Sequence, residues 1–427
     1  AGTAAPLAAV LSDVTGFETL RVSGVLTTNV DMVQFTGNSG FTRIDNTAAG
    51  ANTFQSVASS VVTLGLGGTS TTTLTRLVDT TTNALSVVRT ELTSTNNVTV
   101  TALTVNDEET LSIAGSTSTG NTVITTLTAN DLTTLTLTGS GAGSVEITNA
   151  IAGAANLATV TASGTTGNVV VNASQSTANM TFTGSLTGTN ALTGGTGSDT
   201  ITGGTAADTI TGGNGADNIS GNAGDDVLAG GIGADSLVAG IGDDTLTGGA
   251  GNDTLTGNEG ADDFVLHATN GVDTIIDFLV GTDDLKVATG QSGETAMLGA
   301  VNEVAPITAA GAGNSVTFAD NSAYYVSFNG AAANLTTGGT ATLSVADLTA
   351  TTLTALAAYL DERFASSATN ADDVVLAVNW TAGGSTTTYI YEHVEADATA
   401  TIVASELTLV GIVSRGTTIL TTGDFIA

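Results

Sequence analysis

The sequence predicts an all-β protein, in which a β-solenoid or layered β-structure is followed by a parallel β-roll and a β-rich C-terminal domain. Three observations support this fold class. Threonine alternates with aliphatic residues over residues 1–190, a nine-residue unit repeats eight times between Gly194 and Val265, and short apolar runs typical of strands follow residue 286. These changes in pattern predict three domains, at 1–190, 191–285 and 286–427.

The first region contains a weak internal repeat. LTVNDEETLSIAG at 103–115 matches LTANDLTTLTLTG at 127–139, and related phrases occur at 18–24 and 155–164. A period of roughly 20–25 residues with alternating apolar and polar positions predicts the coils of a β-solenoid or stacked β-layers. The acidic run at 107–109 is interpreted as a charged loop between strands or as a further calcium site, and the first interpretation is favoured.

The nine-residue units keep the same residue type at two positions. In order they are GGTGSDTIT, GGTAADTIT, GGNGADNIS, GNAGDDVLA, GGIGADSLV, AGIGDDTLT, GGAGNDTLT and GNEGADDFV. Position six is always aspartate: Asp199, Asp208, Asp217, Asp226, Asp235, Asp244, Asp253 and Asp262. Position eight is always large and apolar: Ile201, Ile210, Ile219, Leu228, Leu237, Leu246, Leu255 and Phe264. A disordered acidic linker has no physical reason to keep an apolar residue at every ninth position.

The recurring positions of the unit have physical roles. The last three residues predict a short strand whose position-eight side chain enters the core, and the first six predict a tight turn. Glycines at positions one, two and four allow backbone conformations that a β-carbon resists. Such turns direct carbonyl oxygens and the aspartate carboxylate to one place, and Ca²⁺ prefers flexible, all-oxygen coordination. Because successive units lie on alternate sides of the roll, aspartates two units apart are expected to stack on one edge.

The stacked aspartates predict that metal binding and folding are coupled. Neighbouring coils lie about 4.8 Å apart, and two carboxylates at that spacing repel by about 3 kcal/mol at an effective dielectric near 20. No Lys or Arg occurs between Gly194 and Leu285 to offset this repulsion. Several Ca²⁺ ions are therefore the expected cofactors, and they are expected to be required for the roll to fold.

Composition excludes several classes of partner. The 427 residues contain 7 Lys and Arg against 40 Asp and Glu, a formal net charge of −33, which argues against nucleic-acid and anionic-membrane binding. The chain has no cysteine, so calcium rather than disulfides is expected to stabilise an extracellular fold. No apolar run reaches the roughly 20 residues of a membrane-spanning helix, so no membrane insertion is expected. The first residues, AGTAAPLAAV, indicate a piece of a longer chain rather than a signal peptide.

The sequence does not predict an enzyme. It has two histidines, His267 and His393, and contains no H-E-x-x-H, no G-x-S-x-G and no cysteine nucleophile. The adjacent acids Asp372 and Asp373 would point to opposite faces of a strand, which argues against a cooperating carboxylate pair. Aromatic residues make up 4% of the chain, which is few for the stacking surfaces of carbohydrate-active sites.

The third region predicts strands and one helix. Residues 324–328, 374–378 and 386–391 are typical of strands, being rich in β-branched and aromatic side chains. Five apolar residues from Leu353 to Phe364 follow helical spacing and predict one short amphipathic helix whose apolar side belongs to the core.

The repeat resembles the glycine- and aspartate-rich nonapeptide of RTX proteins. The segment 267–285 is similar to the one that follows their last nonapeptide, where carboxylates complete terminal calcium sites. This resemblance implies that Asp277 and Asp283 lie near metal, whereas Asp273 and Asp284 are equally well interpreted as loop acids. Residues 372–397 resemble the C-terminal β-hairpin of RTX proteins, and the final residues, Asp-Phe-Ile-Ala, resemble an uncleaved signal for type I secretion.

The resemblance also implies a set of ligands. In RTX rolls, carbonyls of positions two and four and the aspartate of one turn meet carbonyls of positions one and three and the aspartate two turns later. Carried over, the first site comprises Gly195, Gly197, Asp199, Gly212, Asn214 and Asp217, and the second comprises Gly204, Ala206, Asp208, Gly221, Ala223 and Asp226. Further turn residues expected at the metal sites are Gly213, Gly215, Gly224, Gly230, Gly231, Ile232, Gly233, Gly242, Gly248 and Gly257. Ala206, Asn222, Ala239 and Asn258 replace an expected glycine, which predicts strain or weaker binding in those turns.

The composition of the whole chain is similar to that of RTX-type bacterial surface-layer (S-layer) proteins. That resemblance implies a secreted structural protein of the cell surface that binds copies of itself in a calcium-dependent two-dimensional lattice of hexamers. It also implies that lipopolysaccharide is bound through a separate N-terminal region, for which this sequence has no candidate. Two alternatives remain open: an RTX adhesin or biofilm protein, and the C-terminal calcium-binding carrier half of a secreted enzyme.

Overall fold

The computed structural model is all-β and forms two compact units, Ala1–Gly224 and Asp225–Ala427. It describes residues 19–22, 30–31, 42–46, 50–57, 63–66, 70–76, 83–89, 96–267, 271–279, 282–288, 300–303, 316–317, 322–329, 335–337, 341–343, 364–365, 374–382, 385–393 and 407–415. These residues include no helix, and therefore none of the length and apolar character needed to cross a bilayer. The all-β prediction is confirmed.

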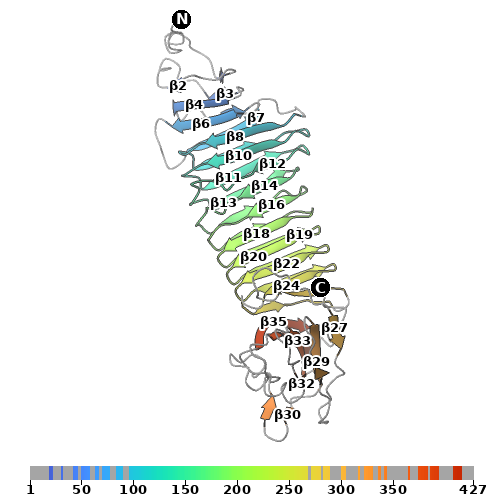
Figure 1. Ribbon diagram of the computed structural model, residues 1–427. Helices are drawn as coiled ribbons and strands as arrows, with labels where there is room; N and C mark the ends of the chain where they lie inside the picture. The colour runs from blue at the N-terminus through green and yellow to red at the C-terminus, as the bar shows by residue number, and fades with distance from the viewer. Residues whose placement is uncertain are drawn as a thin grey trace, which may run out of the picture. The chain divides into compact units, whose positions relative to one another are not determined.

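The first unit is a parallel β-solenoid in which each coil adds one strand to each of two sheets (Figure 1). One sheet contains β1 (Thr19–Val22), β3 (Arg43–Asn46), β5 (Thr63–Leu66), β7 (Ala84–Arg89), β9 (Thr110–Ala114), β11 (Thr134–Gly139), β13 (Thr159–Thr165), β15 (Thr181–Thr183), β17 (Thr200–Thr202) and β19 (Asn218–Ala223). The other contains β2 (Val30–Asp31), β4 (Gly50–Val57), β6 (Ser70–Arg76), β8 (Val98–Thr104), β10 (Thr122–Thr128), β12 (Val145–Ile147), β14 (Val169–Asn172), β16 (Asn190–Thr193) and β18 (Thr209–Asn214).

The register of the strands confirms the predicted coil length. Leu103 lies opposite Leu127, its equivalent in the internal repeat. The coil then shortens, because Ala191 lies opposite Thr209, which is only two nonapeptides further along the chain. Phe182 pairs with Ile201, so the change from threonine-rich sequence to nonapeptides near residue 190 occurs inside one continuous stack of strands.

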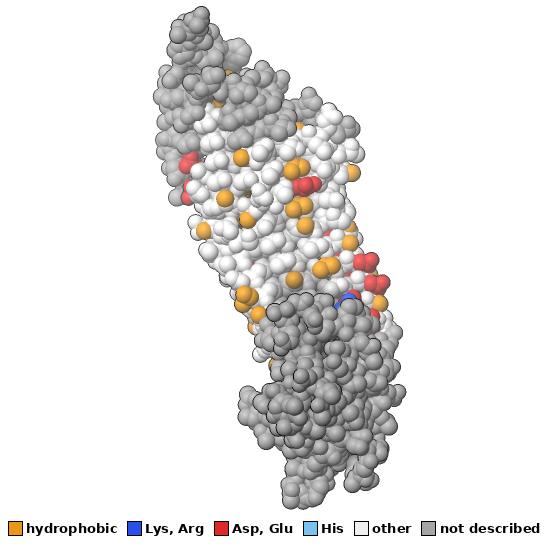
Figure 2. Space-filling view, in the orientation of Figure 1, with side chains coloured by type: hydrophobic (Ala, Val, Ile, Leu, Met, Phe, Trp, Pro, Cys, Tyr) orange, Lys and Arg blue, Asp and Glu red, His pale blue; other side chains and the backbone are white. Residues whose placement is uncertain are grey.

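The core of the solenoid consists of aliphatic side chains that alternate with outward-facing polar ones. In β8 and β10, for example, Val100, Leu103, Ile124 and Leu127 are at most 1% exposed, while most of the threonines between them are partly exposed. Parallel neighbours stack like residues directly above one another, which gives long apolar columns. The face of these coils drawn in Figure 2 carries few charged side chains. This arrangement follows directly from the Thr-aliphatic alternation.

The second unit has the same coil type and then adds an antiparallel segment. One sheet contains β20 (Val227–Ile232), β22 (Thr245–Ala250), β24 (Asp263–His267) and β26 (Asp284–Ala288). The other contains β21 (Ser236–Ile241), β23 (Thr254–Glu259) and β25 (Asp273–Ile275), followed in space by β35 (Leu407–Arg415), β34 (Ser385–His393), β33 (Val374–Ala382), β29 (Ser322–Asn329) and β27 (Ala300–Glu303). Two small sheets pair β28 (Val316–Thr317) with β32 (Phe364–Ala365) and β30 (Leu335–Thr337) with β31 (Ala341–Leu343).

The strands of the third region agree with the pattern of its sequence. β33 and β34 pair as the antiparallel hairpin expected within 372–397, and β29 contains the strand predicted at 324–328. The predicted helix lies outside the described residues, apart from Phe364, which begins β32. The final four residues and the pair at 372–373 also lie outside the described residues.

The position-eight residues of all eight nonapeptides are fully buried, as the pattern predicts. Each is 0% exposed, from Ile201 to Phe264. In the second unit these buried side chains end at an aromatic pair, because the rings of Phe264 and Phe278 lie 5.8 Å apart between centroids. Burying one such side chain stabilises the fold by about 1.5–3 kcal/mol. The core therefore aligns the coils and sets where the turns at their edges lie.

Candidate metal centre

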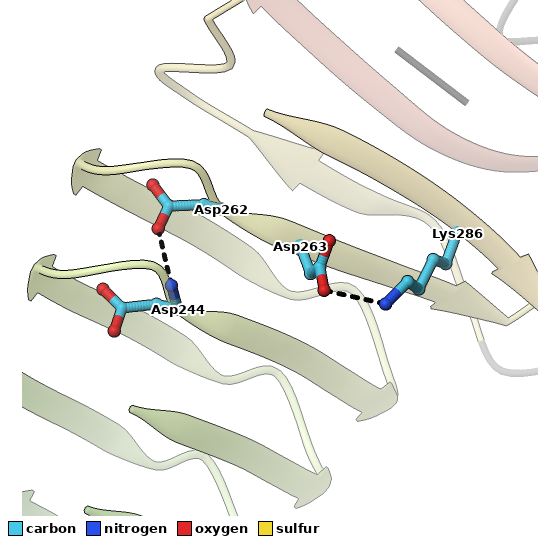
Figure 3. Close-up of polar contacts among 4 residues, drawn as sticks. All are labelled: Asp244, Asp262, Asp263 and Lys286. Atoms are coloured by element: carbon cyan, nitrogen blue, oxygen red, sulfur yellow. Dashed lines mark hydrogen bonds and ion pairs between the residues drawn. The ribbon is translucent and has the colours of Figure 1, made fainter. Parts of the chain in front are cut away.

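The position-six aspartates form ladders that run along the edges of the roll. At four steps, the backbone N–H of one aspartate donates to Oδ1 of the aspartate two units later. Such steps join Asp199 to Asp217 at 2.7 Å, Asp226 to Asp244 at 2.7 Å, Asp235 to Asp253 at 2.8 Å and Asp244 to Asp262 at 3.1 Å. The predicted stacking of alternate aspartates is thus observed within each compact unit, and Figure 3 shows the step from Asp244 to Asp262.

The second oxygen of these carboxylates differs from the first in the later repeats. Oδ2 of Asp244, Asp253 and Asp262 is buried and accepts no hydrogen bond from any described residue. All three side chains belong to residues that are at most 1% exposed. A buried carboxylate oxygen without a donor is costly, because it has lost water and gained nothing in return. A bound cation is the simplest partner for such an oxygen.

Glycine at position one leaves room beside this oxygen. A β-carbon built on Gly248 would lie 2.3 Å from Oδ2 of Asp253, and one on Gly257 would lie 2.2 Å from Oδ2 of Asp262. Any side chain at these positions would occupy the space that the carboxylate faces. The glycines therefore preserve a cradle next to the oxygen that lacks a donor.

Burial and mutual repulsion raise the pKa of the ladder carboxyls. The pKa of Asp262 rises to about 7, mainly because the group is desolvated and also because Asp283, Asp244 and Asp277 lie nearby. Desolvation likewise raises the pKa of Asp199, Asp208, Asp244 and Asp253. At Asp244, Asp253 and Asp262, where Oδ2 has no donor among the described residues, the protein alone therefore holds the carboxylate in an unfavourable charged state, which a divalent cation would relieve.

The nearby basic side chain does not neutralise the ladder. Lys286 Nζ lies 2.7 Å from Oδ2 of Asp263, which points away from the ladder edge (Figure 3). A second ion pair joins Arg43 to Asp45, far upstream in sequence. Neither of these two ion pairs, formed between described residues, includes a position-six aspartate, so they leave Asp244 and Asp262 without a neutralising partner.

The backbone of the turns is left-handed from the third repeat onward. Positions two and four have φ between 71° and 153° in every repeat from Gly213 to Gly260, including Asn222 at 79° and Asn258 at 71°. A β-carbon on Gly251 would lie 1.6 Å from the carbonyl oxygen of Gly233 in the equivalent turn two units earlier. Asparagine tolerates this region better than other non-glycine residues, so Asn222 and Asn258 keep the turn shape at a modest cost in strain.

The donor set fits calcium. The described residues contain no group of three or more His, Cys, Asp or Glu side chains that could hold a metal, so backbone carbonyls would have to complete any site. Aspartate oxygens with turn carbonyls are hard, flexible ligands of the kind that Ca²⁺ binds, and they suit neither zinc nor copper. Mg²⁺ is disfavoured as well, because it demands a rigid octahedron.

The predicted turn ligands lie at the ends of strands and in the turns between them. Gly195, Gly197, Gly204 and Ala206 are in the turns after β16 and β17. The later parts of strands β18, β19, β20, β22 and β23 contain Gly212, Gly213, Asn214, Gly221, Ala223, Gly230, Gly231, Ile232, Gly248 and Gly257. The turns after β18, β19, β20 and β21 contain Gly215, Gly224, Gly233 and Gly242. Ile232 could contribute only its backbone carbonyl to a metal site, because its side chain has no donor atom.

The acids after the last repeat extend both ladders. Asp253 N–H donates to Asp273 Oδ1 at 3.1 Å, and Asp262 N–H donates to Asp283 Oδ1 at 3.2 Å. Asp277 instead accepts the N–H groups of Gly257 and Asn258 at 3.0 and 2.8 Å. Both residues predicted to lie near the terminal sites, Asp277 and Asp283, thus contact the last repeat.

Sequence reasoning left open the role of Asp273, which proves to be a ladder residue. It is 3% exposed, and its pKa rises to about 7 through desolvation and the nearby Asp253 and Asp235 carboxylates. The triplet Asp273-Thr274-Ile275 repeats the Asp-x-apolar pattern of the nonapeptides, but it comes slightly later than the nine-residue period requires. The Asp-x-apolar triplet, taken without the nine-residue spacing, is therefore the sequence signal that marks Asp273 as a ladder residue.

The acidic run at 107–109 forms part of the solenoid wall. Glu108 is 0% exposed, and the Glu109 carboxylate accepts the Asn83 N–H at 2.6 Å. The Glu109 carbonyl accepts hydrogen bonds from Thr133 and Thr134 in the next coil. These contacts connect neighbouring coils.

Comparison with known protein families agrees with this geometry. The chain matches the RTX calcium-binding nonapeptide repeat over residues 193–228, 229–264 and 238–275. A search of curated proteins found no match. The matched segments contain all eight position-six aspartates and the turns described above, and repeats of this family bind Ca²⁺. The chain therefore contains RTX calcium-binding nonapeptide repeats, which form part of a β-solenoid.

Proposed function

We propose that this chain is a structural, non-enzymatic protein of a calcium-dependent two-dimensional layer at the cell surface. In this proposal it is exported by type I secretion, folds when it meets extracellular calcium, and then binds copies of itself, with hexamers as the repeating unit. The observation that carries the calcium-dependent step is the buried Oδ2 of Asp244, Asp253 and Asp262, which accepts no hydrogen bond.

The difference in calcium concentration across the cell envelope determines when the roll folds. Extracellular calcium modules bind with dissociation constants of about 10⁻⁴–10⁻³ M, far above cytosolic calcium. Inside the cell, the repulsion within the ladder therefore opposes folding of the roll, which keeps the chain suitable for export. Outside, calcium stabilises the folded form by mass action.

The chemistry of the surface favours a structural role. The coils of the first unit form a parallel stack with threonine-rich faces, and the sequence lacks the histidine, cysteine and serine motifs of common hydrolases. At a formal net charge of −33, identical copies repel one another. Divalent cations that bridge carboxylates of neighbouring copies would overcome this repulsion, whereas monovalent salt only screens it.

Electron microscopy of the purified chain tests the assembly step. Ordered sheets are expected in millimolar calcium, and none in sodium or potassium chloride of matched ionic strength with chelator. Ordered sheets in chelator would contradict calcium bridging. A protein that folds in calcium yet stays monomeric at high concentration would contradict the surface-layer role and favour an adhesin or the carrier half of a secreted enzyme.

A further inference from the structure

The first two nonapeptides differ from the later ones in the backbone of their turns. Gly195, Gly197 and Gly204 are outside the left-handed region, as is Ala206, whereas positions two and four of every later repeat are inside it. The sequence GGTGSD of the first repeat and GGAGND of the seventh give no reason for this difference. The different backbone conformation of the first two turns must therefore result from the residues that these turns contact.

The carboxylates of these two repeats are occupied by backbone N–H groups. Oδ2 of Asp199 accepts the N–H of Gly195 at 2.8 Å, and Oδ2 of Asp208 accepts that of Gly204 at 2.6 Å. Oδ1 of Asp199 accepts the N–H of Met180 at 2.8 Å. The amide hydrogens therefore occupy the approach to Oδ2 that is open in the aspartates of the sixth to eighth repeats.

The position-two carbonyls of these turns also accept backbone hydrogen bonds. The Gly195 carbonyl accepts the N–H of Asn214 at 2.9 Å, and the Gly204 carbonyl accepts that of Ala223 at 3.3 Å. A cation placed there would have to break these hydrogen bonds and face amide hydrogens. The feature that sets the first two turns apart from the later ones is thus the Oδ2 of Asp199 and Asp208, which accepts a backbone N–H where a cation would bind.

Directly upstream lies a nonapeptide with asparagine in place of aspartate. Residues 185–193, SLTGTNALT, have Gly188 at position four, Asn190 at position six and Leu192 at position eight. Leu192 is 1% exposed and pairs with Ile210, as a position-eight residue should. Asn190 N–H donates to Asp208 Oδ1 at 2.7 Å, which is the ladder hydrogen bond of the repeats.

The amide of Asn190 binds the groups that a cation would otherwise bind. Its Nδ2 lies 3.0 Å from the Ser185 carbonyl oxygen, 3.2 Å from that of Gly188 and 2.9 Å from Asp208 Oδ1. Its Oδ1 accepts the Ser185 N–H at 2.6 Å, and the residue is 3% exposed. A neutral side chain thus gathers two turn carbonyls and a carboxylate oxygen without a metal.

We propose that Asn190, Asp199 and Asp208 form a hydrogen-bonded junction that needs no calcium, and that calcium-binding turns begin with the third repeat at Gly212. The threonine-rich solenoid through residue 211 then folds first and gives the calcium-dependent coils an edge on which to form. This inference rests on calcium-dependent folding of the later repeats but not on assembly into a surface layer.

Hydrogen–deuterium exchange of the full chain, read by mass spectrometry with and without chelator, tests the junction. Peptides within 184–211 are expected to keep their protection in chelator, while peptides within 213–285 lose it. Loss of protection in both segments together would overturn the junction alone. Equal protection of 213–285 with and without chelator would contradict both calcium-dependent folding and the junction.

Asn190→Asp provides a gain-of-dependence test. The variant replaces the donating amide with a carboxylate beside Asp208 and restores the repeat pattern. Protection of 184–211 in chelator should fall at least tenfold and return with calcium. Thr189→Asp adds the same charge at the adjacent, exposed side chain and should leave protection unchanged. Equal behaviour of the two variants would overturn the role assigned to the Asn190 amide.

Discussion

The backbone N–H of Asp244 donates to Oδ1 of Asp262, two units later, while Oδ2 of both carboxylates is buried without a donor. One oxygen therefore holds adjacent coils together. The other oxygen of Asp262 lies beside a space kept open by Gly257, whereas the repeat of Asp244 has Ala239 at the equivalent position. This division of roles connects the nine-residue period of the sequence to calcium-dependent folding.

Removing one ladder charge should weaken calcium binding specifically. Asp244→Asn keeps an oxygen for the Asp226 N–H but replaces Oδ2 with a donor, so calorimetry should show a lower calcium stoichiometry and a higher midpoint. Asp243→Asn is the matched control, because Asp243 is exposed and its Oδ1 can still accept the Ala261 N–H. Equal loss of calcium in the two variants would argue against the ladder as the binding site.

Mild acid should stabilise the roll in the absence of calcium. Asp262 and Asp273 have pKa values of about 7 in the folded protein, above the ordinary value of 3.8 for an unfolded chain. Between pH 3.8 and pH 7 the folded state binds more protons than the unfolded chain, so the free energy of unfolding rises as pH falls from 8 towards 5. This added stability is lost as pH rises through 7. In chelator, the β-signal in circular dichroism should therefore increase on acidification.

With calcium present, the same protons compete with the metal. The calcium midpoint for folding should then rise as pH falls over the same range. A metal-free roll that loses β-structure between pH 8 and pH 5 would contradict the raised carboxyl pKa values.

The strand residues Leu228 and Val227 offer a matched test of the core. Leu228 is 0% exposed, and its neighbour Val227 on the opposite face is 48% exposed. Leu228→Ala should lower the free energy of unfolding by about 2–5 kcal/mol through the cavity it creates. Val227→Ala should change it by less than about 0.5 kcal/mol. Denaturant unfolding in saturating calcium measures both, and similar values would refute the assignment of position eight to the core.

In the left-handed turns, replacing glycine with a residue that has a β-carbon should destabilise the fold, whereas replacing asparagine with glycine should not. Gly251→Ala combines a φ of 141° with a contact to the Gly233 carbonyl, so its cost should exceed the roughly 1–2 kcal/mol of the conformation alone. Asn258→Gly relieves a φ of 71° and should be within about 1 kcal/mol of the parent. Thermal unfolding in calcium compares them, and a tolerated Gly251→Ala would contradict the stacked-turn geometry.

Much of the fold follows from local periodicity. The internal repeat of the first region predicted that Leu103 would lie opposite Leu127, and the nonapeptide period predicted the burial of every position-eight side chain from Ile201 to Phe264. Both inferences depend only on spacing, because parallel coils place equivalent residues directly above one another. The pairing of alternate aspartates along each ladder is predictable for the same reason.

Other features depend on tertiary contacts that spacing does not encode. The turn after β16 has the glycines of a calcium turn, yet it packs on the Ser176 carbonyl of an irregular coil and adopts another backbone. The nine-residue pattern does not identify Asp273, because the coil that contains it is slightly longer than those of the repeats. The role of Asn190 becomes visible only when its amide is seen among the Ser185 and Gly188 carbonyls.

Calcium titration of the chelated full-length chain, followed by circular dichroism, tests most directly the claim that calcium folds the roll. β-structure should be lost in chelator, return cooperatively as calcium reaches the submillimolar to millimolar range, and fail to return in sodium chloride of matched ionic strength. A spectrum unchanged between excess chelator and saturating calcium at neutral pH would contradict calcium-dependent folding.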